Sequence, residues 1–243
     1  MSISSGANPE NIGKIGEDFL NGRVLLFNKP LYWTSFDLVN KIKAILRYRL
    51  DLKKIKIGHA GTLDPLATGL MIVCTGKETR NIEKYQNQSK EYNACITLGA
   101  TTPSYDLETD INARFPVEHI TKSLVETTLD TFKGIQPQVP PDFSARFVNG
   151  KRAYTLARSG KVLELDPKEI SIYDITLISC TMPSIEITVS CSKGTYIRAL
   201  ARDIGIRLQS GAYLSGLVRT RIGEFLLKDS MNIEEFERNF VFL

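Results

Sequence analysis

The segment GHAGTLDPLATG, at 58–69, holds the carboxylate whose surroundings most favour chemistry. Asp64 stands before Pro65, and a residue before proline is pushed out of the α region of backbone space. Glycines within the segment allow tight turns and the close approach of a ligand. The pattern therefore indicates a carboxylate displayed on a loop. A structural alternative stays open, because Asp is a favoured N-cap and Pro a favoured first residue, so Asp64-Pro65 would open a one-turn helix.

The segment CSKGTYIRALARDIG, at 191–205, has the pattern of a strand end, a glycine turn and the start of a helix. Thr195 is placed to cap that helix, and Arg198 and Arg202 lie one turn apart on the same face. A strand-to-helix junction that carries Lys193 and Arg198 suits an anion or a carboxylate. The alternative is a capped amphipathic helix whose arginines face solvent.

An alternating segment starts at Tyr92, where Tyr92, Ala94, Ile96 and Leu98 share one face. This alternation predicts a half-buried strand. A tyrosine exposed at a strand end can stack on a nucleobase. The alternative is a tyrosine in the core, which is the commoner place for an aromatic ring.

The formal net charge is +4 and the pI about 8.8, a mild excess that many enzymes share. The distribution is more informative, because three separated segments are basic and acids gather at 234–237. If these segments fold onto one face, they form a phosphate-binding surface; otherwise they are three solvated stretches. The basic residues are Lys41, Lys43, Arg47, Arg49, Lys53, Lys54 and Lys56, then Arg146, Lys151, Arg152, Arg158 and Lys161, then Lys193, Arg198, Arg202, Arg207, Arg219 and Arg221.

Composition excludes several classes of protein. Hydrophobic residues make up 42% and charged residues 24% of 243, as in ordinary soluble domains. No run reaches the roughly 18 apolar residues of a membrane helix, and the first residues lack the pattern of a secretory signal, so we expect a cytoplasmic protein. The four cysteines form no CxxC pair and are expected to be buried free thiols. With only His59 and His119, a multi-histidine metal site cannot be built.

The elements that must position these segments follow from periodicity. We expect a strand at 24–27, an apolar run at 70–74 and strands from 92 and over 185–191. A helix is predicted after Thr34 and Ser35, with Phe36, Val39, Ile42 and Leu46 on its buried face. Further helices are expected at 124–132 and from 197, with a long irregular excursion at 134–152. Residues 1–20 are predicted to be a polar lead-in to a single α+β domain over 1–243.

Taken together and in this order, these segments resemble the TruB-type tRNA pseudouridine synthases, which isomerise uridine-55 in the T arm of transfer RNA. The resemblance covers most of 24–223, and the combination of its second and fifth blocks is highly specific. The blocks are KPLYWTS at 29–35, GHAGTLDPLATG at 58–69, KEYNACITLGA at 90–100, SARFVNGKRAYTLAR at 144–158, CSKGTYIRALARDIG at 191–205 and LVRTRIG at 217–223.

The resemblance implies the pseudouridine synthase fold, a mixed, mostly antiparallel central sheet flanked by helices and loops. It implies that Asp64 is the essential catalytic residue and that Arg198 ion-pairs with it. The reaction moves one bond on one sugar without redox chemistry, so no cofactor and no metal are expected. Further roles implied are substrate binding by His59, Thr62, Tyr92, Asp106, Tyr196 and Leu217, and contacts to the RNA backbone by Arg146, Lys151, Arg152 and Lys193.

This sequence departs from the family pattern at three points. Tyr32 stands where the first block has a glycine, and the stretch that precedes Asp106 is weakened to TTPSYD. Only about 20 residues follow Gly223, too few for the family's C-terminal RNA-binding PUA-like domain. We therefore expect the catalytic domain alone, a monomer without an obligate protein partner and without membrane contact, in which a thumb-like loop at 134–160 closes on the T arm of tRNA.

Three rival functions are weighed against this one. A non-catalytic RNA-binding protein of the same fold has no need of Asp64, Tyr92 and Arg198 together. A guide-RNA-dependent pseudouridine synthase needs partner subunits and a PUA-like domain. An acid/base hydrolase needs a second carboxylate in a loop comparable to that of Asp64, and the sequence offers none.

Overall fold

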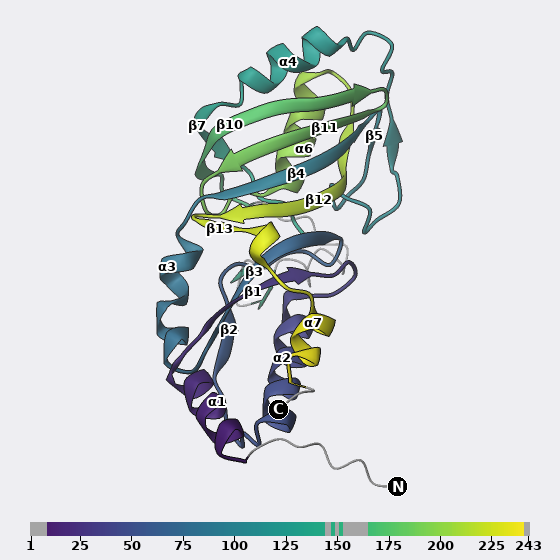
Figure 1. Ribbon diagram of the computed structural model, residues 1–243. Coiled ribbons are helices and arrows are strands. Elements are labelled where there is room, and N and C mark those ends of the chain that lie inside the picture. The colour runs from purple at the N-terminus through teal and green to yellow at the C-terminus, as the bar shows by residue number, and fades with distance from the viewer. Residues whose placement is uncertain (1–8, 144–146, 149–150, 153–164, 241–243) are drawn as a thin grey trace, which may run out of the picture. The chain divides into compact units, whose positions relative to one another are not determined.

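The computed structural model describes residues 9–143, 147–148, 151–152 and 165–240. It divides into two compact units, the first formed by Met1–Gln88 with Val218–Leu243 and the second by Ser89–Leu217. Strand β12 (Ala212–Ile222) contains the second boundary, so the chain passes from one unit to the other within that strand (Figure 1). The expectation that 1–243 is a single catalytic domain stays a prediction.

The first unit is built on strands that pair antiparallel. Strand β1 runs beside β3 from Val24↔Cys74 to Lys29↔Gly69, and β2 pairs with the other end of β3 at His59↔Val73. Strand β13 pairs with the end of β12. The elements are α1 (Pro9–Asn21), β1 (Val24–Lys29), α2 (Ser35–Arg49), β2 (Ile57–His59), β3 (Ala67–Thr75), η1 (Gly76–Asn81), α3 (Ile82–Gln86), β13 (Phe225–Leu226), η2 (Leu227–Asp229) and α7 (Ile233–Arg238).

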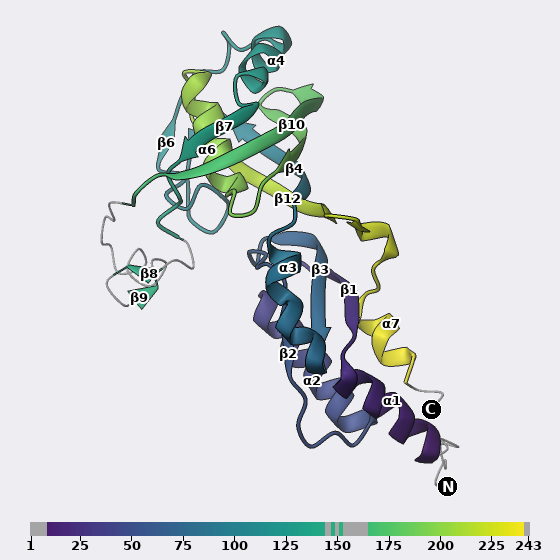
Figure 2. The same cartoon turned by 90° about the vertical axis from the view of Figure 1, so that its left-hand side faces the viewer.

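Strand β3 is buried on both faces, which explains its continuous apolar run. Leu70, Ile72 and Cys74 pack in one cluster with Tyr85 of α3. Figure 2 shows α3 in front of these strands and α2 behind them. Gly69 has a φ of +106°, and a Cβ there would lie 2.4 Å from the backbone oxygen of Arg219.

Two helices of this unit differ from their predictions. Residues 9–21 form helix α1, where a polar lead-in was expected. The helix buries Phe19 on one face, while most of the residues around it in the sequence are polar. In α2 the buried face is Leu38, Ile42, Ile45 and Leu46, with Val39 beside it. The prediction for Phe36 was wrong: its side chain is 69% exposed, since the first apolar position of the stripe is Leu38.

The second unit has an antiparallel sheet in the order β7-β10-β11-β4. Strands β4 and β11 alternate buried and exposed residues as predicted. Helix α4 packs on β10 and on α6, and α6 packs on β4 (Figure 1). The elements are β4 (Lys90–Leu98), β5 (Ala100–Thr101), β6 (Ala113–Arg114), α4 (Lys122–Asp130), β7 (Gly134–Gln138), β8 (Phe147–Val148), β9 (Lys151–Arg152), β10 (Lys168–Thr181), β11 (Ser184–Cys191) and α6 (Ile197–Arg207).

The fold class is therefore α+β. The strand pairs described above all run antiparallel, and isolated parallel bridges join Phe27 to Met231 and Asp106 to Leu214. This agrees with the predicted mixed, mostly antiparallel architecture. Among the described residues, none of the helices combines the length and apolarity that a bilayer crossing requires.

Candidate active site

Asp64 lies in a tight turn of the first unit. The Ala67 N–H donates to the Asp64 carbonyl at 3.1 Å, and strand β3 starts directly at Ala67. The alternative of a one-turn helix was therefore wrong: a turn leads straight into a strand. Leu63 is buried and Asp64 is half-buried, so the residue before the carboxylate is anchored in the core of the turn.

The start of helix α2 holds this turn in place. The Ser35 hydroxyl accepts from the Leu63 N–H at 2.9 Å and donates to the Leu63 carbonyl at 3.1 Å. The Tyr32 N–H donates to the Pro65 carbonyl at 2.8 Å. Thr34 caps α2 in a capping box with Asp37, which fixes the helix end that carries Ser35. The KPLYWTS block therefore supports the turn that bears Asp64.

Arg219 of β12 is 1% exposed and binds the backbone of the same segment. Its Nε donates to the Leu70 carbonyl at 2.7 Å, and its two terminal nitrogens donate to the carbonyls of Gly61 at 3.2 Å and Thr62 at 3.4 Å. Carbonyl dipoles thus compensate a buried guanidinium. The Thr62 side chain itself is exposed, and its bond with Arg219 is made by the backbone carbonyl.

Lys29, at the end of β1, is a second buried cation of this unit. Its side chain is 0% exposed, and its Nζ donates to the carbonyls of Trp33 at 2.6 Å and Pro30 at 2.9 Å. The pKa of Lys29 is lowered to about 8: burial is the main cause, the Asp64 carboxylate opposes the shift, and the nearby Arg219 guanidinium adds to it. The Asp64 carboxylate thus lies within electrostatic range of a buried ammonium group.

His59 ends β2 and opens the same segment. Burial, and then the Arg219 guanidinium, lower the pKa of His59 below its usual value. Its Nδ1 is shielded from solvent and has no hydrogen-bond partner in the part of the chain that the structure describes. A shielded polar atom of this kind costs free energy unless a partner arrives.

In the second unit, Arg198 is 4% exposed on α6. Its terminal nitrogens donate to the carbonyls of Phe143 at 2.9 Å and Ser104 at 3.3 Å. The alternative of a solvent-facing arginine was wrong for this residue. The prediction that Thr195 caps the helix was also wrong: Tyr196 is the N-cap, and the Thr195 hydroxyl donates to Ser192 at 3.0 Å, which closes the preceding turn.

Asp106 is the ion-pair partner of Arg198 within this unit. Its Oδ2 lies 3.6 Å from the Arg198 Nε, and both side chains are buried. Its Oδ1 accepts from the Glu108 N–H at 2.9 Å, as in an Asx-turn, and its carbonyl accepts from the hydroxyls of Thr102 and Ser104. Despite the weakened motif, Asp106 is tightly placed.

The other substrate-binding candidates of this unit lie on several elements. Tyr92 is 8% exposed on β4, so the structure places it in the core and not exposed at a strand end. Tyr196 is half-buried: the Gln138 side chain accepts from its N–H at 2.8 Å and donates to its carbonyl at 3.1 Å. Leu217 is half-buried on β12.

The structure describes three of the four residues predicted to contact the RNA backbone. Lys193 is exposed in the turn between β11 and α6. Lys151 and Arg152 form β9, whose backbone pairs with Phe147 and Val148 of β8. Arg146, like Arg158 and Lys161 of the same basic segment, lies outside the described residues.

The remaining histidine, His119, contacts a backbone carbonyl, and the cysteines are free thiols. The His119 Nε2 is 2.8 Å from the Leu208 carbonyl. All four cysteines are free, but only Cys74 and Cys191 are buried; Cys95 and Cys180 are half-buried, so that part of the prediction was wrong. Burial raises the pKa of the Cys74 thiol to about 11. No group of three His, Cys, Asp or Glu side chains within the described ranges is arranged to hold a metal ion.

The sequence prediction missed four positioning residues: Lys29, Ser35, Arg219 and Gln138. Three of them stand in the quoted blocks KPLYWTS and LVRTRIG, so a signal was present. These residues position the turn because they are buried, whereas a charged or polar residue in a sequence is expected to be exposed. Gln138 had no signal, since a glutamine among prolines is typical of a loop; the prediction of an irregular excursion from 134 was wrong here, because residues 134–138 form β7 and pair with β10.

Solved structures identify the class of the fold. The chain matches a chain of a Cbf5–Nop10–Gar1 complex with a TM-score of 0.71 and 25% identity, covering 100% of this chain and 61% of that one. A structure of an H/ACA RNP bound to a substrate RNA that contains 2′-deoxyuridine matches with a TM-score of 0.69 at 24% identity. The chain thus spans about three fifths of the chains that it matches in these structures. The fold is the pseudouridine synthase fold.

Sequence relatives then identify the family. The family model "TruB family pseudouridylate synthase (N terminal domain)" matches residues 47–197. A protein of Parabacteroides distasonis named tRNA pseudouridine synthase B is 60% identical over 220 residues, which cover 90% of this chain and 94% of that protein. Proteins of the same name from Bacteroides fragilis and Flavobacterium johnsoniae are 58% and 48% identical, over 94% and 98% of their lengths. The chain belongs to the TruB family of pseudouridylate synthases, which are isomerases.

Proposed function

We propose that this enzyme converts uridine-55 of the tRNA T arm to pseudouridine, with Asp64 as the essential carboxylate. The relatives at 58–60% identity that are named tRNA pseudouridine synthase B support tRNA as the substrate. One structural observation carries the role of Asp64: its half-buried carboxylate stands on a turn whose backbone is fixed by the Ser35 hydroxyl and the Arg219 guanidinium. Fixed placement of a reacting group is a main source of catalytic rate.

The chemistry asks for one well-placed anion. The bond between the ribose C1′ and the uracil N1 breaks, the base turns, and a bond forms between C1′ and C5; the C5 hydrogen leaves as a proton and N1 gains one. No electrons enter or leave, so no redox partner is required. Asp64 serves at the ribose–uracil junction as nucleophile or as charge stabiliser.

The target base must leave its stack, which costs a few kcal/mol. We assign His59 to the binding of the extruded nucleotide, since its shielded Nδ1 gains a partner when RNA or a rearranged loop arrives. Tyr92 would stack on the uracil, and because it is 8% exposed this requires its covering neighbours to move. Tyr196, Leu217 and Thr62 complete the proposed contacts with the nucleotide.

Arg198 is proposed to ion-pair with Asp64 in the reacting complex, in addition to its pair with Asp106. Asp106 then acts as a positioning residue. The thumb-like loop at 134–160 is proposed to close on the T arm, with Arg146, Lys151 and Arg152 on its phosphates and Lys193 adding a further contact. A monomeric state and a cytoplasmic location stay predictions.

The role of Asp64 is tested with the Asp64→Asn variant, which removes the charge and keeps the shape. We expect its turnover of an unmodified tRNA transcript to fall by about a thousandfold or more, while tRNA affinity stays within a few-fold. Tritium release from C5-labelled uridine gives the rate, and mapping of the product gives the site.

The matched control is Asp229→Asn, an exposed aspartate of the same unit, which should retain wild-type turnover. Normal turnover by Asp64→Asn would remove this residue from the mechanism. Pseudouridine at another position would overturn the assignment to uridine-55. Absence of pseudouridine with wild-type enzyme and bare transcript would favour a non-catalytic or guide-dependent protein.

A further inference from the structure

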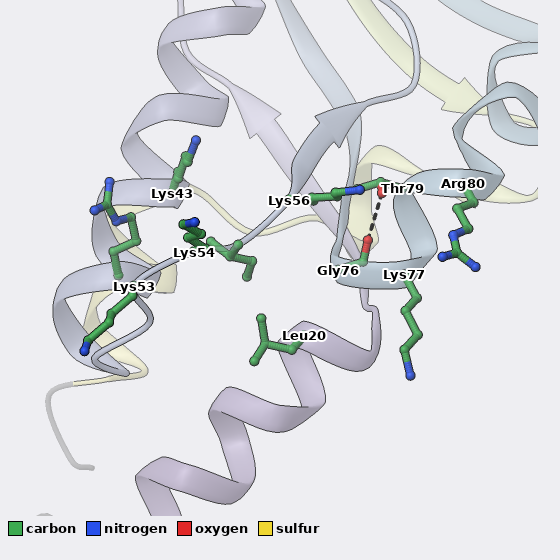
Figure 3. Close-up of a pocket in the computed structure, with 11 residues that line it drawn as sticks. Leu20, Lys43, Lys53, Lys54, Lys56, Gly76, Lys77, Thr79 and Arg80 are labelled. Atoms are coloured by element: carbon green, nitrogen blue, oxygen red, sulfur yellow. Dashed lines mark hydrogen bonds between the residues drawn. The ribbon is translucent and has the colours of Figure 1, made fainter.

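A cavity in the first unit has a wall composed mainly of cations (Figure 3). It measures about 570 Å³ and has 11 lining residues, of which seven are Lys or Arg and none is acidic. All seven cations are exposed. They come from separate elements: Lys43 and Arg47 from α2, Lys53, Lys54 and Lys56 from the segment before β2, and Lys77 and Arg80 from η1.

The floor of the cavity is made from parts that hold their places. Ile55 is 6% exposed, and the Thr79 hydroxyl donates to the Gly76 carbonyl at 2.8 Å within η1. The Gly76 N–H donates to the Lys56 carbonyl at 2.9 Å, which ties η1 to the basic segment before β2. The Lys77 Nζ donates to the Asn21 Oδ1 at 3.0 Å, which joins the end of α1 to the rim. The cations are therefore gathered by the fold and do not merely adjoin in sequence.

The composition of this wall selects the chemistry of a ligand. Pockets for small molecules are lined mainly by apolar and aromatic side chains, whereas here only Leu20 and Ile55 are apolar. Seven like charges repel one another, and a ligand with several phosphates removes that repulsion. Cations spread over three segments match a chain of phosphodiesters better than a single phosphate, because successive phosphates recur along a backbone.

The position of the cavity connects it with the catalytic segment. Lys56 directly precedes β2, and β2 ends at His59, the first polar residue of the segment that bears Asp64. A three-residue strand spans about 10 Å, roughly three base-pair steps of a nucleic acid helix. An RNA whose target nucleotide lies at Asp64 thus has backbone within reach of this wall.

A second, adjoining cavity of about 430 Å³ shares Arg47 and Lys53 with the first. Its lining includes Tyr48, which is 84% exposed and carries the Arg49 guanidinium over its ring at 5.6 Å. An exposed aromatic ring beside cations is the combination that single-stranded nucleic acids use for stacking and charge pairing. The single acid of this lining, Asp51, does not face the main cavity.

We infer that this basic cavity is a second tRNA-binding site, which holds the phosphodiester backbone several nucleotides from the isomerised uridine. The inference rests on the proposed function, because it extends the same substrate across the first unit. It assigns to the cavity a share of the binding free energy and no part in the chemical step.

The test compares two triple variants with the same loss of charge. The cavity variant, Lys53→Gln/Lys54→Gln/Lys77→Gln, removes three positive charges from the cavity wall. The control variant, Lys14→Gln/Lys84→Gln/Lys228→Gln, removes three positive charges from exposed lysines of the same unit outside the cavity. All six positions are exposed, so both variants should fold; matching circular dichroism and melting curves check this. Affinity for an unmodified tRNA transcript is measured from 50 to 400 mM NaCl, with turnover at saturating tRNA.

We expect the cavity variant to lose about two to three from the slope of log affinity against log salt, and about tenfold in affinity at moderate salt. The control variant should keep its slope within about 0.5, and both should keep wild-type turnover at saturation. Equal slopes in the two variants would overturn the inference. So would loss of binding to anionic phosphatidylserine vesicles with an unchanged tRNA slope, because the occupant would then be a membrane.

This result is separable from the proposed function. Pseudouridine formed by the wild-type enzyme with equal slopes overturns only the second site. Absence of pseudouridine with any tRNA overturns the proposed function, and with it the inference that depends on it.

Discussion

The two buried cations of the first unit show how much of a carboxylate's setting is invisible in a motif. The sequence predicted a loop position for Asp64, and the structure places this half-buried residue at the start of a turn; its role stays a prediction. Lys29 and Arg219 were not predicted, although both stand in recognised blocks, since an isolated lysine or arginine is expected in solvent. Their burial became visible only when the carbonyls of Trp33, Gly61 and Leu70 were placed around them.

The lowered pKa of Lys29 predicts a pH dependence of stability. The group titrates near pH 8 when folded and near 10.5 when unfolded, so between these values the unfolded chain binds more protons. Stability therefore rises with pH across this window, and the cost of the buried charge is fully present below pH 8. Relative to Lys29→Met, the wild type should gain on the order of 1–2 kcal/mol of unfolding free energy between pH 7 and 9.5.

Urea denaturation of both proteins at the two pH values measures this difference. The two carbonyls left without a donor in Lys29→Met cost the same at each pH, so they do not affect the comparison. Lys84→Met, at an exposed lysine of the same unit, should show no such divergence from the wild type. Parallel profiles for wild type and Lys29→Met would contradict the assignment.

At the scale of elements, the turn that leads into α2 carries a residue type that its backbone disfavours. Tyr32 has a φ of 66°, in the left-handed region, and its side chain is 74% exposed. The family pattern has glycine there, and the structure explains why: glycine adopts this positive φ without strain, and with it the N–H reaches the Pro65 carbonyl. The departure seen in the sequence is thus a tyrosine held in a strained, left-handed conformation.

We expect Tyr32→Gly to be more stable than the wild type. Relief of the left-handed strain is worth about 1–2 kcal/mol, and the greater freedom of glycine in the unfolded chain takes back about 0.4–1 kcal/mol. The net gain in unfolding free energy should be up to about 1.6 kcal/mol, read from urea midpoints. Tyr32→Ala removes the same ring but keeps the strain, so a gain as large in that variant would refute the explanation.

Sequence periodicity predicted β4, β11 and α6 because one face of each is buried in its own unit. It missed α1, and in α2 it placed Val39, Ile42 and Leu46 correctly but failed for Phe36. In α2 the apolar Phe36 precedes the true stripe, and only packing against neighbouring elements shows that Leu38 begins it. In α1 the signal was present but passed over: Ile12, Ile15 and Phe19 recur at i, i+3 and i+7 among polar residues and glycines, which is the spacing of an amphipathic helix.

At the scale of the whole molecule, charge is the property that the sequence predicted least completely. The sequence did not decide whether the first basic segment forms part of a phosphate-binding surface or is a solvated stretch. The structure gathers five of its members around one cavity and adds Lys77 and Arg80 from a distant segment. That addition depends on the backbone bond from Gly76 to Lys56, which no local pattern predicts.

If the cavity and the thumb-like loop bind different parts of one tRNA, their contributions should add. Lys151→Gln/Arg152→Gln should reduce the salt slope by about two, and its combination with the triple cavity variant should lose the sum of the separate losses. Affinities measured over the same salt series check this. A combined loss no larger than that of the cavity variant alone would mean that both sets of residues contact the same phosphates.

The lack of space around Gly69 restricts which mutations the gene can tolerate. A Cβ there would meet backbone atoms of Arg219 at 2.4 and 2.6 Å, and φ is +106°. Those atoms belong to a strand and cannot withdraw as a flexible side chain would. Every missense mutation of this codon therefore forces β3 and β12 apart beside the turn that bears Asp64, so a saturation library of the gene should return glycine as the only residue tolerated at this site.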